Sequence, residues 1–308
     1  MPGPRFPEFY IIGAPKCGTT ALYTYLGEHP SVFMPQMKEP HYFATDYVDF
    51  PRVADLDSYL ALFKDAPPTS LWGEASVWYL YSHEAVANII KARPDAKIFV
   101  MLRNPADAVE ALHAQLLVNF MENIYDLEEA WRAQDDRMAG KRVPLHCTVV
   151  DHVLYGQAFS YAHQLKRLFS IVPRDQVRVL IYEELFANPE PIFAEVQKFL
   201  GLKVIARAEF ERINPSRRPQ NLLVHHLLAK PPYPLNLILA ALRRVSRKYG
   251  LHLGVPLMRI AVKLAKIQPA KRPAMRPEFR KELYEFFSKD ISEVEQILGR
   301  PLRSWWSS

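Results

Sequence analysis

The sequence predicts an α/β fold of the P-loop-like kind, with three layers in which a central, mostly parallel sheet is flanked by helices. Two observations support this prediction. Short, continuously apolar segments of strand length alternate with longer helical patterns along the 308 residues, which is typical of buried parallel strands joined by helices. In addition, a glycine-rich turn joins the first expected strand to the first expected helix, as in phosphate-binding loops.

The expected elements follow one another in a regular order. Pro30 ends the first helix, and Gly201 follows a later one as a C-cap. Strand patterns occupy residues 9–12, 98–102 and 177–182, and helical patterns occupy 19–28, 106–140, 152–170 and 192–200.

The texture changes after residue 213. Residues 214–234 are rich in proline and basic residues, and we expect a ligand-facing loop that leads to a helical segment at about 235–266. A last helix is expected at about 277–298. The chain is therefore predicted to be a single domain, 1–308, with a helical C-terminal elaboration at roughly 225–270.

The composition is that of an ordinary globular protein, with 49% hydrophobic and 23% charged residues. A net charge of +6 and a pI of about 9.1 slightly favour anionic ligands. Cys17 and Cys147 belong to no Cys/His cluster, so neither a disulfide framework nor a zinc site is expected. Two unclustered cysteines suit a reducing compartment, and we expect a cytoplasmic location. No apolar stretch has the length of a signal peptide or a membrane span. A basic helix after Leu235 leaves peripheral membrane contact open, and no nucleic acid polymer is expected as a partner.

The glycine-rich turn carries its lysine in an unusual place. The segment reads GAPKCGTTALYTYL over 13–26, whereas a nucleoside triphosphatase loop has lysine directly after the second glycine, where this chain has Thr19. A strand, a turn and a helix gather N–H groups and the positive end of a helix dipole around an anion. Lys16 would then neutralise charge on a leaving oxygen. A tight turn with incidental polar residues is the alternative. The expected anion contacts are Gly13, Lys16, Cys17, Gly18, Thr19 and Thr20.

A second signal follows the strand at 98–102, which runs directly into Arg103-Asn104-Pro105. Open α/β sheets bind ligands at the carboxyl ends of their strands, and arginine binds phosphate through two parallel hydrogen bonds. If this strand lies beside the first one, Arg103 and the loop share one crevice. An arginine paired with a nearby carboxylate is the alternative.

These segments resemble motifs of the sulfotransferases that use 3′-phosphoadenosine 5′-phosphosulfate (PAPS), especially bacterial and carbohydrate-type members. The family pattern G-x-x-K-x-G-T-[ST]-x-L matches Gly13 to Leu22 without a gap, and L-R-[ND]-P matches residues 102–105. In that family the lysine faces the phosphate–sulfate bridge and the arginine binds the 3′-phosphate. The resemblance implies an enzyme that moves a sulfuryl group from PAPS to a hydroxyl or amine and releases 3′,5′-adenosine bisphosphate (PAP), with no metal.

The resemblance extends to residues 73–80, 177–189, 196–202 and 276–306, and has one clear departure. The family usually has a serine eight residues after its arginine, and this chain has Ala111. His113 or Arg217 could replace that hydroxyl. A basic loop covers the nucleotide in several family branches, and Arg217 and Arg218 are the candidates for it here.

A candidate base lies in MPQMKEPHYF, residues 34–43. Pro40 favours an extended conformation at Glu39, which would turn Glu39 and His41 to the same side. A surface loop with a Lys38–Glu39 pair is the alternative. Many carbohydrate-type and bacterial sulfotransferases have a similar K-E-[PV]-H-[YF]-F segment whose glutamate is implicated as the base. We expect Glu39 to be the base, with His41 as second choice or as an acceptor-positioning group.

Several other points stay open at this stage. Glu74 and Ser76 could line the site, and Cys17 lies near a helix N-terminus, which can lower the pKa of a thiol. A P-loop kinase is disfavoured by Thr19 and by the arginine after the most apolar strand, and a non-catalytic nucleotide-binding protein is the other rival because of Ala111. The acceptor could be a small molecule, a carbohydrate or a lipid alcohol.

Overall fold

The computed structural model describes residues 4–47, 50–207, 210, 217–219, 267–269 and 275–306. The chain divides into two compact units. The first comprises residues 1–108, 158–214 and 280–308, and the second comprises 109–157 and 215–279. The single domain expected from the sequence stays a prediction.

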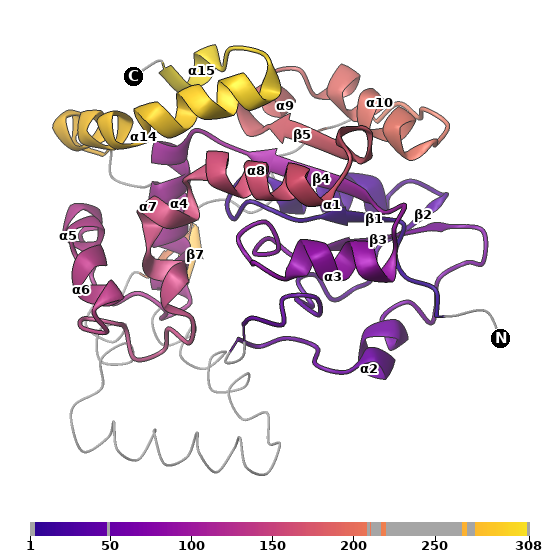
Figure 1. The fold of residues 1–308 in the computed structure, drawn as a ribbon, viewed down its shortest axis with the longest axis horizontal. Coiled ribbons are helices and arrows are strands. Elements are labelled where there is room, and N and C mark those ends of the chain that lie inside the picture. Colours follow the sequence, from indigo (N-terminus) through magenta and orange to yellow (C-terminus); the bar gives the residue numbers. More distant parts are fainter. Residues whose placement is uncertain are drawn as a thin grey trace, which may run out of the picture. The chain divides into compact units, whose positions relative to one another are not determined.

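A five-stranded sheet forms the centre of the first unit (Figure 1), and every neighbouring pair of its strands is parallel. The predicted α/β class with a mostly parallel central sheet is therefore confirmed. The strand order is β2-β3-β1-β4-β5. The strands are β1 (Phe9–Ile11), β2 (Val32–Phe33), β3 (Leu71–Ala75), β4 (Lys97–Leu102) and β5 (Val177–Ile181).

The two most apolar strands lie side by side in the middle of this sheet. Residues 9–12 and 98–102 have no exposed surface, as expected for strands covered on both faces. The register pairs Phe9 with Lys97 and Ile11 with Phe99. The chain order reverses between β1 and β4, because the strands after β1 add on one side of it and β4 and β5 add on the other. Ligands of open α/β sheets bind at such a point.

Helices of the first unit flank this sheet (Figure 1). The helix ending at Leu200 is capped by Gly201 with φ 75°. The predicted strand at 177–182 ends one residue early, because Tyr182 begins a helix. The helices are α1 (Thr19–Gly27), α2 (Leu56–Ala61), α3 (Ala85–Ala92), α8 (Tyr161–Ile171), α9 (Tyr182–Ala187), α10 (Pro189–Leu200) and α15 (Arg303–Trp306), together with most of α14 (Pro277–Leu298). The helical patterns predicted from the sequence match α1, α8, α10 and α14, whereas α2, α3, α9 and α15 were not predicted.

Two predicted long helices are interrupted. Phe120 has φ 59°, and the Asp126 carboxylate accepts the Glu129 amide at 2.8 Å as an N-cap, so a new helix starts there. The region 106–140 therefore contains α4 (Pro105–Val118), α5 (Leu127–Arg132) and α6 (Gln134–Met138), and 152–170 contains the end of η1 (Val150–Val153), α7 (Tyr155–Ala158) and most of α8.

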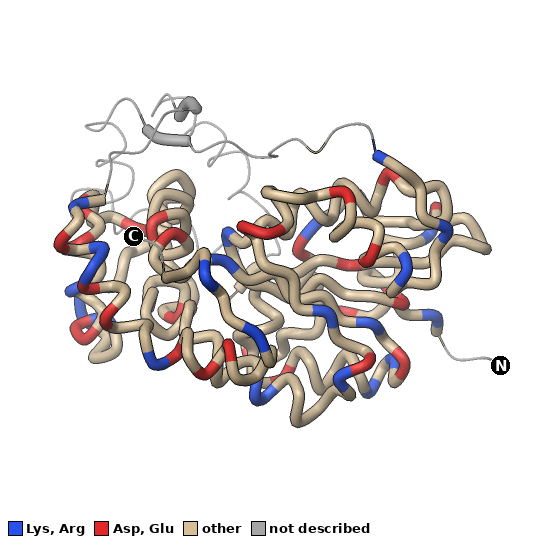
Figure 2. The backbone as a smooth tube through the Cα atoms, turned by 90° about the horizontal axis from the view of Figure 1, so that it is seen from above, with Lys and Arg blue, Asp and Glu red and all other residues tan. Residues whose placement is uncertain are grey.

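The second unit contains a two-stranded antiparallel ribbon, β6 (Arg217–Pro219) with β7 (Ile267–Pro269). The helix expected at about 235–266 lies outside the described residues. The predicted last helix is confirmed as α14. Charged residues of both signs are interspersed along the outer helices and loops (Figure 2). Within the part of the chain that the structure describes, no helix has the length and apolar character needed to span a membrane.

Candidate active site

The loop between β1 and α1 lies at the carboxyl end of the central strand. Gly18 caps α1 with φ 87°, and Lys16 has φ 62°. The left-handed conformation at Gly18 favours glycine, and an added Cβ there would lie only 2.9 Å from Cδ2 of Tyr182. Thr19 and Thr20 form the start of α1, whose first turn contains no acidic residue. The positive end of the helix dipole is therefore available to an anion.

Cys17 behaves as a core residue. Its thiol is fully buried, donates to the Pro15 carbonyl at 3.3 Å and lies 3.5 Å from the Tyr161 hydroxyl. Burial raises the pKa of Cys17 to about 12, so the lowering that a helix N-terminus can cause is overridden by the loss of solvation. Because its amide also donates to the Ala14 carbonyl at 3.3 Å, a contact of Cys17 with an anion stays a prediction.

Arg103 leaves β4 beside this loop. Its Nη1 lies 3.5 Å from the Lys16 carbonyl oxygen, and its guanidinium carbon lies 4.5 Å from the centre of the Tyr182 ring. The nearest carboxylate, that of Asp107, is 3.9 Å from Nη2, which is too long for a hydrogen bond. The expected adjacency of the two predicted phosphate-binding segments is therefore observed, and the alternative arginine–carboxylate pair is present only as a loose contact.

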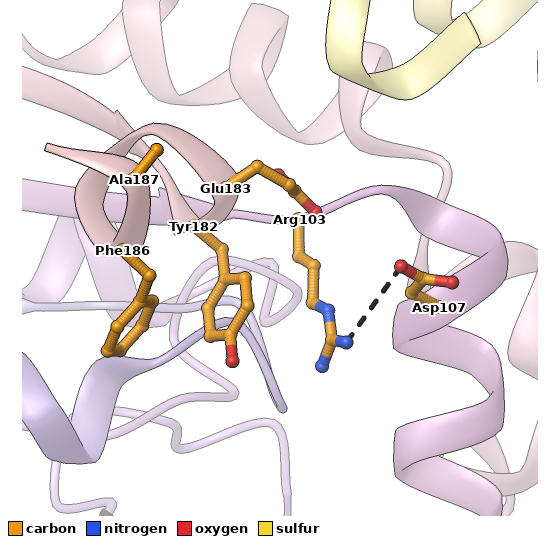
Figure 3. A pocket seen from close by; sticks show the side chains of 6 residues that line it. All are labelled: Arg103, Asp107, Tyr182, Glu183, Phe186 and Ala187. Atoms are coloured by element: carbon orange, nitrogen blue, oxygen red, sulfur yellow. Dashed lines mark ion pairs between the residues drawn. The ribbon is translucent and has the colours of Figure 1, made fainter. Parts of the chain in front are cut away.

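A pocket of about 410 Å³ opens between β4, α4 and α9 (Figure 3). The Tyr182 and Phe186 rings form one wall, with their centres 4.6 Å apart. An added Cβ on Gly18 would lie 3.3 Å from Phe186, so this wall adjoins the glycine-rich loop. The pocket has the size of a small-ligand site. It is lined by Arg103, Asp107, Tyr182, Glu183, Phe186 and Ala187.

The pocket-wall aromatics are functional candidates that the sequence reasoning missed. The strand pattern at 177–182 was recognised, and a side chain at the carboxyl end of such a strand is a candidate for ligand binding. The neighbour relation of β4 and β5, however, is a tertiary fact. Glu183 fixes the backbone that follows Arg103, because its carboxylate accepts the Asn104 amide and the Trp305 indole N–H, each at 3.0 Å.

The segment with the candidate base has a backbone that differs from the prediction. Glu39 has φ 65° and His41 has φ 50°, so the expected extended conformation at Glu39 is wrong. The preference of a residue before proline is overridden here because the Glu39 amide donates to the Ala75 carbonyl at 2.9 Å. The two side chains still meet, with His41 Nε2 3.6 Å from a Glu39 carboxylate oxygen.

Charge surrounds the Glu39 carboxylate, whose side chain is 37% exposed. Burial favours the protonated acid, but the His41 ring and the Lys38 ammonium, 2.6 Å away, outweigh it and lower the pKa of Glu39 to about 2. The alternative Lys38–Glu39 pair is thus present together with the Glu39–His41 contact. The His41 side chain is 2% exposed, and neither ring nitrogen has a hydrogen-bond partner among the described residues.

Glu74 and Ser76 are fully buried, so neither offers surface to an acceptor. Burial raises the pKa of Glu74 to about 7, although three hydroxyls donate to its carboxylate. Ser76 Oγ accepts the His41 amide at 3.1 Å, so these two residues support the segment of Glu39 without contacting an acceptor.

The remaining candidates lie in the second unit. The backbone of Arg217 and Arg218 belongs to β6, and their side chains are outside what the structure describes, so their contact with a nucleotide stays a prediction. Ala111 is buried in α4, and the His113 ring bonds the Ile124 carbonyl at 2.9 Å. The described residues contain no group of three or more His, Cys, Asp or Glu side chains that could hold a metal ion.

Comparison with known proteins agrees with this geometry. A family model described as "Sulfotransferase domain" matches residues 6–218. The chain is 27% identical over 210 residues to the human bifunctional heparan sulfate N-deacetylase/N-sulfotransferase 3, covering 64% of this chain and 22% of that protein. It is 29% identical over 277 residues to the rat carbohydrate sulfotransferase 15, covering 70% of this chain and 48% of that one. The chain thus spans half or less of the length of these two relatives.

One solved structure resembles the whole chain. It is a sulfotransferase from Alicyclobacillus acidocaldarius, with a TM-score of 0.69, 24% identity and coverage of 98% of this chain and 100% of that one. At this identity the likeness concerns the fold.

Proposed function

The chain belongs to the sulfotransferase domain family, and we propose that it moves a sulfuryl group from PAPS to a hydroxyl or amine of an acceptor. The observation that carries this proposal is the contact of Arg103 with the glycine-rich loop, 3.5 Å from the Lys16 carbonyl oxygen, since Arg103 also lines the 410 Å³ pocket. The Arg103 guanidinium lies beside a loop that contains Lys16 and leads into a helix N-terminus, and this combination suits a ligand with phosphates at two positions.

In this proposal each part of the crevice contacts one part of PAPS. The amides of the loop and the hydroxyls of Thr19 and Thr20 bind the 5′-phosphosulfate. The Arg103 guanidinium binds the 3′-phosphate, and it does so while stacked on Tyr182, which restricts its orientation. The fit rests on charge, on pocket size and on the aromatic wall beside Gly18.

The chemistry is an in-line displacement at sulfur. The bond between sulfur and the phosphate oxygen breaks as the bond to the acceptor oxygen or nitrogen forms, and PAP leaves. Lys16 stabilises the charge that develops on the leaving oxygen. The Glu39 carboxylate, ionised at neutral pH, takes the acceptor proton, and His41, 3.6 Å away, is the second candidate for that step.

The acceptor is proposed from the relatives. Those named above include proteins called heparan sulfate and carbohydrate sulfotransferases, so we propose a carbohydrate hydroxyl or amine first, with a lipid alcohol or a phenol as alternatives. The cytoplasmic location expected from the two cysteines, both free thiols here, stays a prediction.

Isothermal titration with PAP and with ATP/Mg²⁺ tests the donor site. We expect PAP to bind and ATP/Mg²⁺ to bind much more weakly, because Thr19 stands where a triphosphatase has lysine. Tighter binding of ATP/Mg²⁺ would contradict the proposal. Radiolabelled PAPS with a panel of heparosan, chondroitin, phenol and fatty alcohol then tests transfer. PAP binding without turnover of any acceptor would favour the non-catalytic rival.

A further inference from the structure

Every second backbone amide of residues 39–43 donates a hydrogen bond to the last residue of β3 or to the residues that follow it. The Glu39 amide donates to the Ala75 carbonyl at 2.9 Å, the His41 amide donates to Ser76 Oγ at 3.1 Å, and the Phe43 amide donates to Tyr79 Oη at 3.2 Å. The first of these acceptors is backbone, and the other two are side-chain hydroxyls.

Both hydroxyls are oriented by one carboxylate. Ser76 Oγ donates to Glu74 Oε1 at 2.7 Å, and Tyr79 Oη donates to Glu74 Oε2 at 3.0 Å. A hydroxyl has a single hydrogen, so each one that donates to Glu74 presents its lone pairs to the amide on its other side. Glu74 therefore determines which way both acceptors face.

Burial of the Glu74 carboxylate is energetically unfavourable. Glu74 is fully buried on β3, and its third donor is the Tyr59 hydroxyl at 3.1 Å. Among the described residues no Lys, Arg or His forms an ion pair with it. Burial raises the pKa of Glu74, and the charge of Lys38 lowers it in part without forming an ion pair with the carboxylate. A buried carboxylate with no directly paired cation is unfavourable, so a packing function alone would be served as well by an apolar side chain.

The segment needs such support because its backbone is unusual. Glu39 and His41 both have positive φ, 65° and 50°, which residues with a Cβ seldom adopt. Conformations of this kind persist only where the surroundings hold them. The two hydroxyl bonds lie at His41 and Phe43, within and directly after this stretch.

We propose that Glu74 is a positioning residue that acts through Ser76 and Tyr79 to hold residues 39–43 in the backbone conformation that brings the Glu39 carboxylate to the His41 ring. This inference rests on the proposed function for its catalytic meaning, since Glu39 and His41 are the candidate proton acceptors there. Its physical content is independent of the acceptor.

The network offers a matched set of variants. Ser76→Ala and Tyr79→Phe each remove one hydroxyl that links Glu74 to an amide of the segment. Tyr59→Phe removes a hydroxyl from the same carboxylate and keeps the ring, but in the described part of the chain that hydroxyl accepts no amide of the segment. Tyr59→Phe is therefore the control for weaker solvation of Glu74.

Hydrogen exchange of the PAP-bound protein, followed by mass spectrometry, reports on the segment without an acceptor. We expect several-fold faster exchange in peptides covering 39–43 for Ser76→Ala and Tyr79→Phe, and unchanged exchange for Tyr59→Phe. Turnover with PAPS and a heparosan oligosaccharide should show kcat lowered by at least roughly tenfold in the first two variants, because small misplacements of reacting groups are costly. The Kd for PAP should stay within about twofold of the wild type, since the donor site is untouched.

Three outcomes would overturn this inference, and a fourth would overturn only the proposed function. Unchanged exchange in Ser76→Ala overturns the inference, as does faster exchange with unchanged kcat. An equal loss in Tyr59→Phe also overturns it, because the effect would then come from the buried charge itself. If the wild type binds PAP and turns over none of the acceptors, the proposed function fails, and the exchange comparison still decides whether Glu74 holds the segment.

Discussion

Arg103 and Lys16 meet at the carboxyl edge of the sheet, where the Arg103 Nη1 lies 3.5 Å from the Lys16 carbonyl oxygen. The contact joins the ends of the neighbouring parallel strands β1 and β4, which pair Ile11 with Phe99 although these residues lie far apart in the sequence. A ligand that reached both side chains would therefore bridge the point at which the strand order reverses.

Replacing Arg103 by lysine should weaken PAP binding. Lysine keeps the charge but loses the two-point geometry and the stacking on Tyr182. Hydrogen bonds to charged groups contribute about 1.5–3 kcal/mol, so we expect the Kd for PAP to rise by roughly 10- to 100-fold, measured by calorimetry. Arg178, which stacks on Phe199 at 4.2 Å outside the pocket, is the matched control. Equal effects of Arg103→Lys and Arg178→Lys would contradict the assignment.

Lys16→Met should act on the chemical step more than on binding. A group that stabilises developing charge contributes mainly in the transition state, and removal of one such group typically lowers kcat by roughly 10²- to 10³-fold. Single-turnover rates with PAPS and the best acceptor of the panel measure the effect, and calorimetry with PAP gives the binding part. Lys64→Met, at an exposed lysine, is the control. A change in Kd with an unchanged rate would remove Lys16 from this role.

Glu39→Gln should abolish transfer and leave the affinity for PAP nearly intact, because the amide cannot accept the acceptor proton. Exposed Glu190, changed to glutamine, is the control. Full activity of Glu39→Gln would exclude Glu39 as the base, and loss of activity in His41→Asn would then point to the ring.

Glu39 also predicts a pH dependence. Its folded-state pKa is lowered from 4.5 to about 2, so its contribution to stability is present above the unfolded pKa and is lost as the pH falls through about 2. At neutral pH the carboxylate stays ionised. We therefore expect no acid limb from Glu39 in the kcat/KM profile between about pH 5 and 8. An acid limb in that range would contradict the lowered pKa of Glu39.

Glu74 predicts the opposite sign for stability. Burial raises its pKa from 4.5 to about 7, so the folded state holds a proton that the unfolded state releases, and stability from this group is lost as the pH rises from about 4.5 through about 7. The loss amounts to about 3 kcal/mol by the conversion of pKa shifts to free energy. Urea unfolding at pH 5 and pH 8 should show a smaller difference for Glu74→Gln than for the wild type. Equal differences would contradict the raised pKa.

The central strands and the first loop could be predicted from the sequence, because continuous apolar runs define buried parallel strands locally. Residues 9–12 and 98–102 are such runs. The first is followed by the glycine-rich loop and the second by Arg103, and both belong to the proposed donor site. Strands β2 and β3 were missed because one has only two residues and the other contains Gly73 and Glu74, whose burial is explained only by hydroxyls from other elements.

The sequence by itself determined the parallel sheet, the glycine-rich loop at Lys16 and the arginine that follows β4, because each depends on neighbouring residues in the chain. Only the tertiary structure decided that Tyr182 and Phe186 form the pocket wall and that residues 39–43 take positive φ values. Those features depend on which strands are neighbours and on hydrogen bonds between distant segments, such as the one from the His41 amide to Ser76, and local preference is too weak to determine them.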